Sequence, residues 1–220
     1  MPRIARGLSD GFVFHILNRG NGRQEVFHKD GDYHSFVSLI KEAVDEFDLA
    51  VLAYCLMPNH FHFLLQPDKA EVLSKFMQWL MTSHVRRYHQ HYGTSGHVWQ
   101  GRYKSFIVQE DDHLLTVMRY IEGNPVRGNL TKSSKEWKWS SHQERLGRQP
   151  ENIIAEPPIA LPGDWTGFID EPMTASEVER LRRSVNRHTP FGADSWVERG
   201  CETLGLESTL HARGRPKMEK

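Results

Sequence analysis

The stretch CLMPNHFHFLLQP at residues 55–67 limits the fold most, because it is typical of two strands joined by a tight turn. An apolar run at residues 49–56 is followed by the turn MPN and by a second run at 60–66. Side chains alternate along a strand, so His60 and His62 face one side of the sheet and Phe61 and Phe63 face the other. We therefore expect a hairpin with one apolar face and a pair of imidazoles on the opposite face.

The segments around this hairpin predict the rest of the sheet and its helices. Asp32 and Asp111 or Asp112 are expected to cap two of the helices. The order β-α-β-β-α-β is that of a ferredoxin-like, split βαβ fold of the α+β class. We expect an antiparallel sheet with helices on one face, leaving the other face free for a site. Further strands are expected at residues 11–19 and 103–109, and helices at 32–47, 70–92 and 112–123.

The character of the chain changes after about residue 147. Residues 1–147 contain all elements of the predicted sheet and are expected to form the main domain. Residues 148–210 are expected to form a C-terminal extension, in which a proline-rich, irregular stretch precedes short helices. Residues 211–220, HARGRPKMEK, are basic and are expected to be a flexible tail.

The charge, the cysteines and the apolar runs of the chain limit the classes of protein to which it can belong. The 220 residues carry 28 Lys and Arg against 28 Asp and Glu, so the chain is not basic overall, unlike many nucleic-acid-binding domains. Positive charge nevertheless collects at residues 76–109, which contain Arg, Lys and His but no Asp or Glu. The two cysteines show no metal-type spacing, the longest apolar run is too short to span a membrane, and no signal-like stretch stands at the start. We expect a cytoplasmic protein without a disulfide framework.

The histidine pair is a candidate metal site. Two imidazoles that point the same way from one strand can reach one ion, and neutral imidazole is a common ligand of first-row metals. The alternative is a pair of surface histidines on a solvated sheet face, because the pattern His-x-His alone is weakly specific. Two side chains do not complete a metal site, so further ligands must come from another element.

The helix expected at residues 112–123 offers two candidate partners for this pair. Its apolar residues recur at helical spacing and place Tyr120 at the margin of the core-facing stripe. Residues four apart are neighbours on a helix, so Tyr120 and Asn124 can meet the same small group. Taken singly, Tyr120 also fits a half-buried core residue, and Asn124 fits a turn residue before Pro125.

Five stretches of the chain together resemble a known family. MPNHFHFLL at residues 57–65 resembles the histidine–hydrophobic–histidine (HUH) motif of single-strand DNA nucleases. RYIEGNPVR at residues 119–127 resembles the catalytic-tyrosine helix of the single-tyrosine HUH transposases. Residues 16–27, 97–108 and 187–217 match the same group, and the combination is similar to the bacterial REP-associated tyrosine transposases (RAYT). The resemblance covers nearly the whole chain and implies an HUH-type nuclease domain over residues 1–147.

The resemblance implies a role for each of four residues. Tyr120 matches the nucleophile, and His60 and His62 match the metal-binding pair. Asn124 matches the position that supplies an oxygen ligand to a divalent ion, Mg²⁺ or Mn²⁺. One departure is the pair Glu-Gly before Asn124, where the family more often has a hydrophobic residue or histidine and then leucine. Gly123 loosens the last helical turn and so bears on where Asn124 lies.

The activity that the resemblance implies is metal-dependent cleavage and strand transfer of single-stranded DNA at hairpin-forming, REP-like repeats, through a 5′-phosphotyrosine intermediate. Basic grooves with aromatic platforms bind single strands. For Trp99 a core position is an equal alternative, and the basic tail can equally be a solubilising end. The residues expected to contact DNA are Arg19, Arg23, Arg86, Arg87, Trp99, Arg102, Tyr103, Lys104, Arg213, Arg215 and Lys217.

Two other functions stay open on the sequence alone. A repeat-DNA-binding protein with an inactive site would be expected to lack His60, His62 or Tyr120, and all three are present. A metal-dependent hydrolase of small substrates would need another ligand and a water-activating acid near the histidine pair, and the sequence offers no strong candidate. A monomer and a homodimer are both compatible with the sequence.

Overall fold

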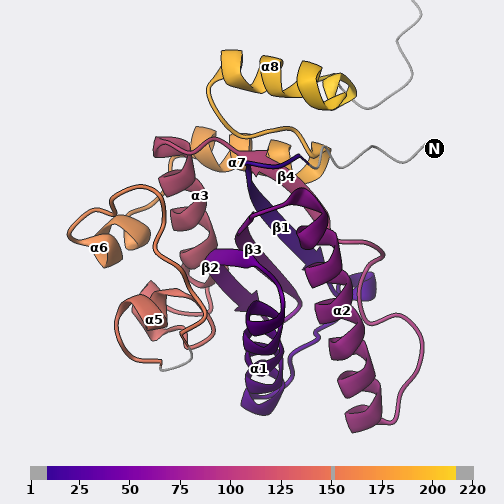
Figure 1. Ribbon diagram of the computed structural model, residues 1–220. Helices are drawn as coiled ribbons and strands as arrows, with labels where there is room; N and C mark the ends of the chain where they lie inside the picture. Colours follow the sequence, from indigo (N-terminus) through magenta and orange to yellow (C-terminus); the bar gives the residue numbers. More distant parts are fainter. Residues whose placement is uncertain (1–8, 150–151, 212–220) are drawn as a thin grey trace, which may run out of the picture.

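A computed structural model describes residues 9–149 and 152–211 and confirms the predicted α+β fold (Figure 1). Four antiparallel strands form one sheet in the order β2-β3-β1-β4. The strands are β1 (Val13–Arg19), β2 (Leu49–Met57), β3 (His60–Pro67) and β4 (Lys104–Val108). The longer helices are α1 (Asp30–Glu46), α2 (Ala70–Tyr92), α3 (Asp112–Glu122), α7 (Ala175–Arg187) and α8 (Asp194–Leu204). Shorter helices are α4 (Asn124–Arg127), α5 (His142–Arg145) and α6 (Trp165–Asp170), with 3-10 turns η1 (Asn21–Arg23), η2 (Ser134–Glu136) and η3 (Glu207–Thr209).

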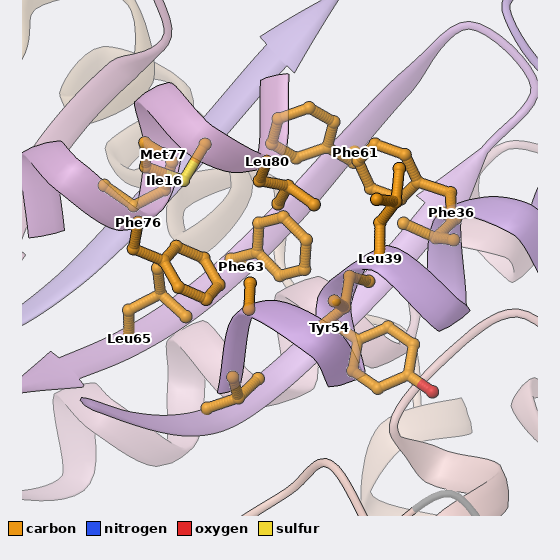
Figure 2. Close-up of a cluster of buried hydrophobic side chains, with 14 of the residues drawn as sticks. Ile16, Phe36, Leu39, Tyr54, Phe61, Phe63, Leu65, Phe76, Met77 and Leu80 are labelled. Atoms are coloured by element: carbon orange, nitrogen blue, oxygen red, sulfur yellow. The ribbon is translucent and has the colours of Figure 1, made fainter. Parts of the chain in front are cut away.

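Helices α1 and α2 cover one face of the sheet. Phe61 and Phe63 of β3 point into this layer, as their alternation predicted, and pack among side chains of both helices (Figure 2). The ring centroids of Phe36 and Phe61 are 5.6 Å apart, and both side chains are fully buried. Burying a side chain of this size stabilises the fold by about 1.5–3 kcal/mol. This layer therefore fixes the facing of β3 and directs the two histidines to the opposite side.

The opposite face of the sheet is also covered, which corrects the prediction that helices lie on one face only. Helix α3 packs there through its apolar stripe, in a second cluster that includes Leu64 of β3 and Phe106 of β4. The physical reason is visible in β2, whose sequence LAVLAYCLM is apolar at nearly every position and buried on both faces. A strand of that kind needs cover on two sides rather than one.

The C-terminal segment is built onto this second face. Trp165, Leu181 and Phe191 join the same apolar cluster as α3. Parallel β-bridges join Ile154 to β2 and Phe191 to β4. The stretch expected to be irregular contains the short helix α6. The domain boundary predicted near residue 147 stays a prediction, and residues 212–220 of the predicted tail lie outside the described residues.

Two aspartates predicted to be helix caps lie at helix starts. Asp111 caps α3, since its carboxylate accepts a hydrogen bond of 2.9 Å from the His113 N–H. Asp32 lies instead within the first turn of α1, where it accepts the N–H of His28 at 2.8 Å and the hydroxyl of Tyr92 at 2.7 Å. It thereby ties the start of α1 to the end of α2. Within residues 9–149 and 152–211, no helix is long and apolar enough to cross a lipid bilayer.

Candidate active site

His60 and His62 leave β3 on the face opposite the phenylalanines, with ring centroids 5.1 Å apart. Asn59, in the turn before β3, holds the first of them: its Oδ1 lies 2.7 Å from His60 Nδ1. An amide oxygen only accepts hydrogen bonds, so His60 Nδ1 carries the hydrogen and Nε2 keeps its lone pair. The turn therefore presents His60 in the tautomer that can bind a metal ion through Nε2.

A third imidazole, that of His15 in β1, extends the cluster, and it was not predicted from the sequence as a site residue. Its Nε2 lies 2.8 Å from Nδ1 of His62, and the two rings stack with centroids 5.0 Å apart. Because Nδ1 of His62 is engaged, Nε2 is its free ring nitrogen, and a metal-binding imidazole is commonly held by a partner in this way. The signal was available: alternation places His15 on one face of its strand, and the split βαβ order makes that strand a neighbour of β3.

Burial keeps these imidazoles neutral. It lowers the pKa of His15 to about 3. It lowers the pKa of His60 to about 4, with the charge of Arg19 acting in the same direction. The pKa of His62 is held well below its usual range, first by burial and then by its neighbours His15, His60, Arg127 and Arg19. Neutral imidazole is the form that binds metal ions, so none of the three must lose a proton at neutral pH to act as a ligand.

Tyr120 approaches the imidazoles from α3. Its ring centroid lies 5.9 Å from that of His62 and 6.3 Å from that of His15. The side chain is 8% exposed and belongs to the second apolar cluster. The packing of α3 on the second face of the sheet is therefore what brings the candidate nucleophile to the histidine pair.

Asn124 lies just beyond α3, as the first residue of α4. Gly123 joins the two helices, and the N–H of Arg127 donates to the Gly123 carbonyl at 3.1 Å, so the chain continues almost helically across the junction. The Asn124 side chain is 9% exposed, and its amide nitrogen has no hydrogen-bond partner among the described residues. Buried amides are normally paired, so an amide without a protein partner points to a group that interacts with something else.

Glu122 accounts for the departure from the family pattern before Asn124. Its carboxylate is fully buried and accepts hydrogen bonds from Trp165 Nε1 at 2.7 Å, from Arg145 Nε at 3.0 Å and from the Ser141 hydroxyl. Burial alone would raise its pKa, but His142, Arg145, Ser141 and Trp165 together hold the pKa below its usual value. The glutamate therefore ties the end of α3 to α5 and α6.

Three of the arginines expected to contact DNA lie near one edge of the site. Arg19 ends β1 and is paired with His60 in the strand register. Arg23 follows in η1, where its carbonyl accepts from the Asn59 side chain at 3.3 Å. The loop that carries Arg102 reaches the same edge, because the N–H of Gln100 donates to the Arg19 carbonyl at 2.7 Å. All three arginines are exposed. Lys104, at the start of β4, is half-buried.

Trp99 and Tyr103 do not form exposed stacking platforms, which corrects that prediction. Trp99 is 5% exposed, packs in the first core, and donates from Nε1 to His84 Nδ1 at 3.1 Å. Tyr103 is 9% exposed and belongs to the same core cluster. A base can stack only on a ring face that solvent reaches, so neither aromatic ring can take this role in the conformation seen here.

The remaining expected DNA contacts lie away from the site or beyond the described residues. Arg86 and Arg87 are on α2, which covers the other face of the sheet. Arg87 is held in an ion pair of 2.8 Å with Glu42 of α1. Arg213, Arg215 and Lys217 lie outside the described residues, so their expected role stays a prediction.

The donor set fits a divalent ion. Two neutral imidazoles and an amide oxygen form a mixed nitrogen and oxygen set, which suits Mn²⁺, and Mg²⁺ can bind where its other ligands are oxygens. In the part of the chain that the structure describes, no group of three or more His, Cys, Asp or Glu could hold a metal ion. Further ligands would therefore come from Asn124, water or substrate oxygens, and such an open site is typical of catalytic rather than structural metals.

Comparisons with known proteins identify a matching family and similar proteins. The family model described as "Transposase IS200 like" matches residues 9–124. A Haemophilus influenzae protein described as a REP-associated tyrosine transposase is 26% identical over 147 residues, which cover 60% of this chain and 83% of the relative. A solved structure of a REP-associated tyrosine transposase bound to a REP hairpin shares the fold, with a TM-score of 0.56 and 16% identity over 73% of this chain and 95% of that one.

Proposed function

Because this chain belongs to the IS200-like transposase family, we propose that it cleaves and rejoins single-stranded DNA at hairpin-forming repeats, with Tyr120 as the nucleophile. The observation that carries the proposal is the position of the Tyr120 ring, 5.9 Å from His62 and 6.3 Å from His15 between centroids. The tyrosine and the imidazoles come from different elements, and a nucleophile and a metal-binding pair must meet in this way to act on one phosphate.

The proposed reaction is an exchange of phosphodiester bonds. The Tyr120 oxygen attacks the scissile phosphorus, the bond from phosphorus to the 3′ oxygen breaks, and the enzyme keeps the 5′ phosphate as a phosphotyrosine. The phenol loses its proton and the released 3′ oxygen gains one, so the break leaves a 3′ hydroxyl. The energy of the broken bond is retained in the phosphotyrosine, so rejoining the strand needs no ATP.

His60, His62 and Asn124 are the residues that would hold the divalent ion. When bound, Mg²⁺ or Mn²⁺ supplies Lewis-acid polarisation of the scissile phosphate. The side chains that surround these ligands prepare them for the ion: Asn59 fixes the tautomer of His60, and His15 engages Nδ1 of His62. The inclusion of Asn124 rests on its match to the family's ligand position, because its unpaired amide nitrogen is a hydrogen-bond donor and not a metal ligand.

Replacing His15 with leucine is expected to weaken Mn²⁺ binding about 10–100-fold, because losing the partner of a ligand imidazole typically costs this much. His15→Gln keeps a hydrogen-bond acceptor near His62 Nδ1 and is expected to recover most of the affinity. Electron paramagnetic resonance of free Mn²⁺ during a titration measures the affinity, and the thermal midpoint of each variant reports its folding. Equal Mn²⁺ affinity of a folded His15→Leu variant and the wild type would contradict this orienting role.

The substrate is expected to be a repeat hairpin with a short single-stranded segment at its foot. The solved relative was bound to a REP hairpin, which supports this class of substrate here. Arg19, Arg23 and Arg102 place exposed positive charge beside His60, where a single-stranded backbone would pass on its way to the nucleophile. A monomer and a homodimer are both compatible with this path.

A covalent-trapping assay tests the proposed function. Labelled single-stranded hairpin repeats taken from beside the protein's own gene are incubated with it and Mn²⁺ or Mg²⁺, and the products are separated on a denaturing gel. We expect label that stays on the protein, together with a free strand ending in a 3′ hydroxyl. Removing the ion with a chelator is expected to abolish both products, because the phosphate then loses its Lewis acid.

The same assay separates the proposal from its alternatives. Tight binding of repeats without an adduct or a cut strand, across both metals and several repeats, would favour a repeat-binding protein with an inactive site. Cut strands that appear without any label on the protein at any time would favour metal-dependent hydrolysis without a tyrosine intermediate.

A further inference from the structure

Arg127 carries a positive charge that is mostly buried and has no carboxylate partner among the described residues. Its guanidinium carbon lies 4.2 Å from the centre of the Tyr120 ring. The guanidinium donates to the backbone carbonyl of Tyr120, and its Nη1 lies 3.8 Å from the sulfur of Met173. The ion pairs found in the described part of the chain do not include Arg127. A charged group therefore lies against the candidate nucleophile without a counter-ion.

The groups that face Arg127 supply further positive charge. Burial lowers the pKa of Arg127 to about 10, with the charges of Arg182 and Arg119 acting in the same direction and Tyr120 and Cys55 opposing the shift. The guanidinium thus stays charged at neutral pH. Burying a charge without a partner is costly, and proteins normally pair such groups or use them to bind an ion of opposite sign. The surroundings favour an anion at this position.

The backbone keeps room for the guanidinium. A Cβ atom at Gly123 would lie 3.0 Å from Arg127 Nη1 and 2.9 Å from the Arg119 carbonyl oxygen, which is closer than side chains normally approach. A larger residue at this position would therefore require a shift of the Arg119 carbonyl and of the Arg127 guanidinium. The absence of a side chain at Gly123 thus leaves space beside the Arg127 guanidinium.

We propose that Arg127 is a catalytic residue that binds the scissile phosphate and stabilises the negative charge that develops there as Tyr120 attacks, an inference that rests on the proposed function. A guanidinium presents N–H donors in a planar fork that matches two phosphate oxygens. The tyrosine oxygen forms the new bond to phosphorus, and the electron pair of the broken bond goes to the 3′ oxygen. Arg127 stays protonated throughout and acts by charge and hydrogen bonds, as fixed donors commonly do in such steps.

A purely structural role is the competing explanation, because the guanidinium also donates to a backbone carbonyl near the end of α3. Such a role would affect the placement of α3 to the same degree whichever substrate is bound. A role at the phosphate depends on the charge of that phosphate. The two can be separated with a methylphosphonate at the scissile position, since this group replaces a charged oxygen with an uncharged methyl.

The test compares wild type and Arg127→Gln on repeat hairpins that differ only at the scissile group. On the natural phosphodiester, single-turnover formation of the protein–DNA adduct is expected to fall about 100–1,000-fold, the usual effect of removing one fixed donor to a developing charge. On the methylphosphonate, the rates of the two proteins are expected to differ by about 3-fold or less, because this group has no charge before attack and only one of the two oxygens that the guanidinium fork would bind. Arg127→Lys keeps the charge without the fork and is expected to lie between the two.

Matched controls keep the outcomes distinct. Arg199→Gln, on the exposed side of α8, is expected to react like wild type with both substrates. An equal loss of the adduct-formation rate for Arg127→Gln on both substrates would overturn the proposal in favour of the structural role. The proposal would also be overturned if Arg127→Gln did not fold and Arg127→Lys reacted at the wild-type rate on both substrates. If the wild type forms no adduct, the proposed function fails, and the relative affinities of both proteins for phosphodiester and methylphosphonate strands decide whether Arg127 holds phosphate.

Discussion

The Tyr120→Phe variant is expected to bind repeat hairpins like the wild type and to form no covalent adduct with them. The substitution removes only the hydroxyl that attacks phosphorus, and it leaves the ring packed in the second apolar cluster of the sheet. Losing the nucleophile of a covalent mechanism typically lowers turnover by about 10³-fold or more. Single-turnover trapping on a denaturing gel measures the adduct, and a filter or mobility assay measures the binding.

Tyr33→Phe is the matched control for this variant. Tyr33 is equally well buried but lies in the first core, stacked on Trp139 with ring centroids 4.8 Å apart. It is expected to give the wild-type adduct yield. An adduct that persists in Tyr120→Phe would show that another residue attacks the DNA, and mass spectrometry of the labelled peptide would identify that residue.

Replacing Glu122 with alanine is expected to lower the free energy of unfolding by about 3–5 kcal/mol, the usual cost of removing one partner from a buried ion pair. The change leaves Arg145 without its buried carboxylate and leaves the indole N–H of Trp165 without an acceptor. Glu122→Gln keeps an acceptor for Trp165 but not the charge, so its loss is expected to be smaller. Equilibrium unfolding in urea measures both.

The control for Glu122 is a glutamate without buried partners. Glu179 is exposed on α7 and takes part in no ion pair within the described residues. Glu179→Ala is expected to change the unfolding free energy by less than about 0.5 kcal/mol. If Glu122→Ala were as stable as Glu179→Ala, the network between α3, α5 and α6 would not hold the end of α3 in solution.

The parts of the site that depend on local periodicity could be predicted from the sequence. Alternation in HFHF was enough to place His60 and His62 on one face, because Phe61 and Phe63, which alternate with them, belong to a core. Helical spacing was enough to place Tyr120 at the margin of the apolar stripe of α3. In each case a single element carries the information.

The parts of the site that depend on contacts between distant segments of the chain could not be predicted from local sequence patterns. His15 matters because β1 pairs with β3, and Arg127 matters because the chain stays nearly helical past Gly123 and turns the guanidinium back over Tyr120. Trp99 stands in a basic and aromatic stretch whose composition resembles a binding surface, yet the indole packs against Phe61 in the core. Composition describes what a segment can do, whereas packing decides which of its side chains reach solvent.

The two outer strands of the sheet, β2 and β4, each have a partner from the C-terminal segment. Ile154 bridges to Val51 of β2, and Phe191 bridges to Val108 of β4. An outer strand without a partner presents free N–H and C=O groups, which can pair with another copy of the same chain. A fragment that ended before Ile154 would keep the candidate nucleophile and metal ligands, and residues 139–141 would still pair with part of β2, but Val51 of β2 and Val108 of β4 would lose their bridges. We therefore expect the C-terminal segment to limit pairing of the sheet edges with other copies of the chain, a role separate from any contact with DNA.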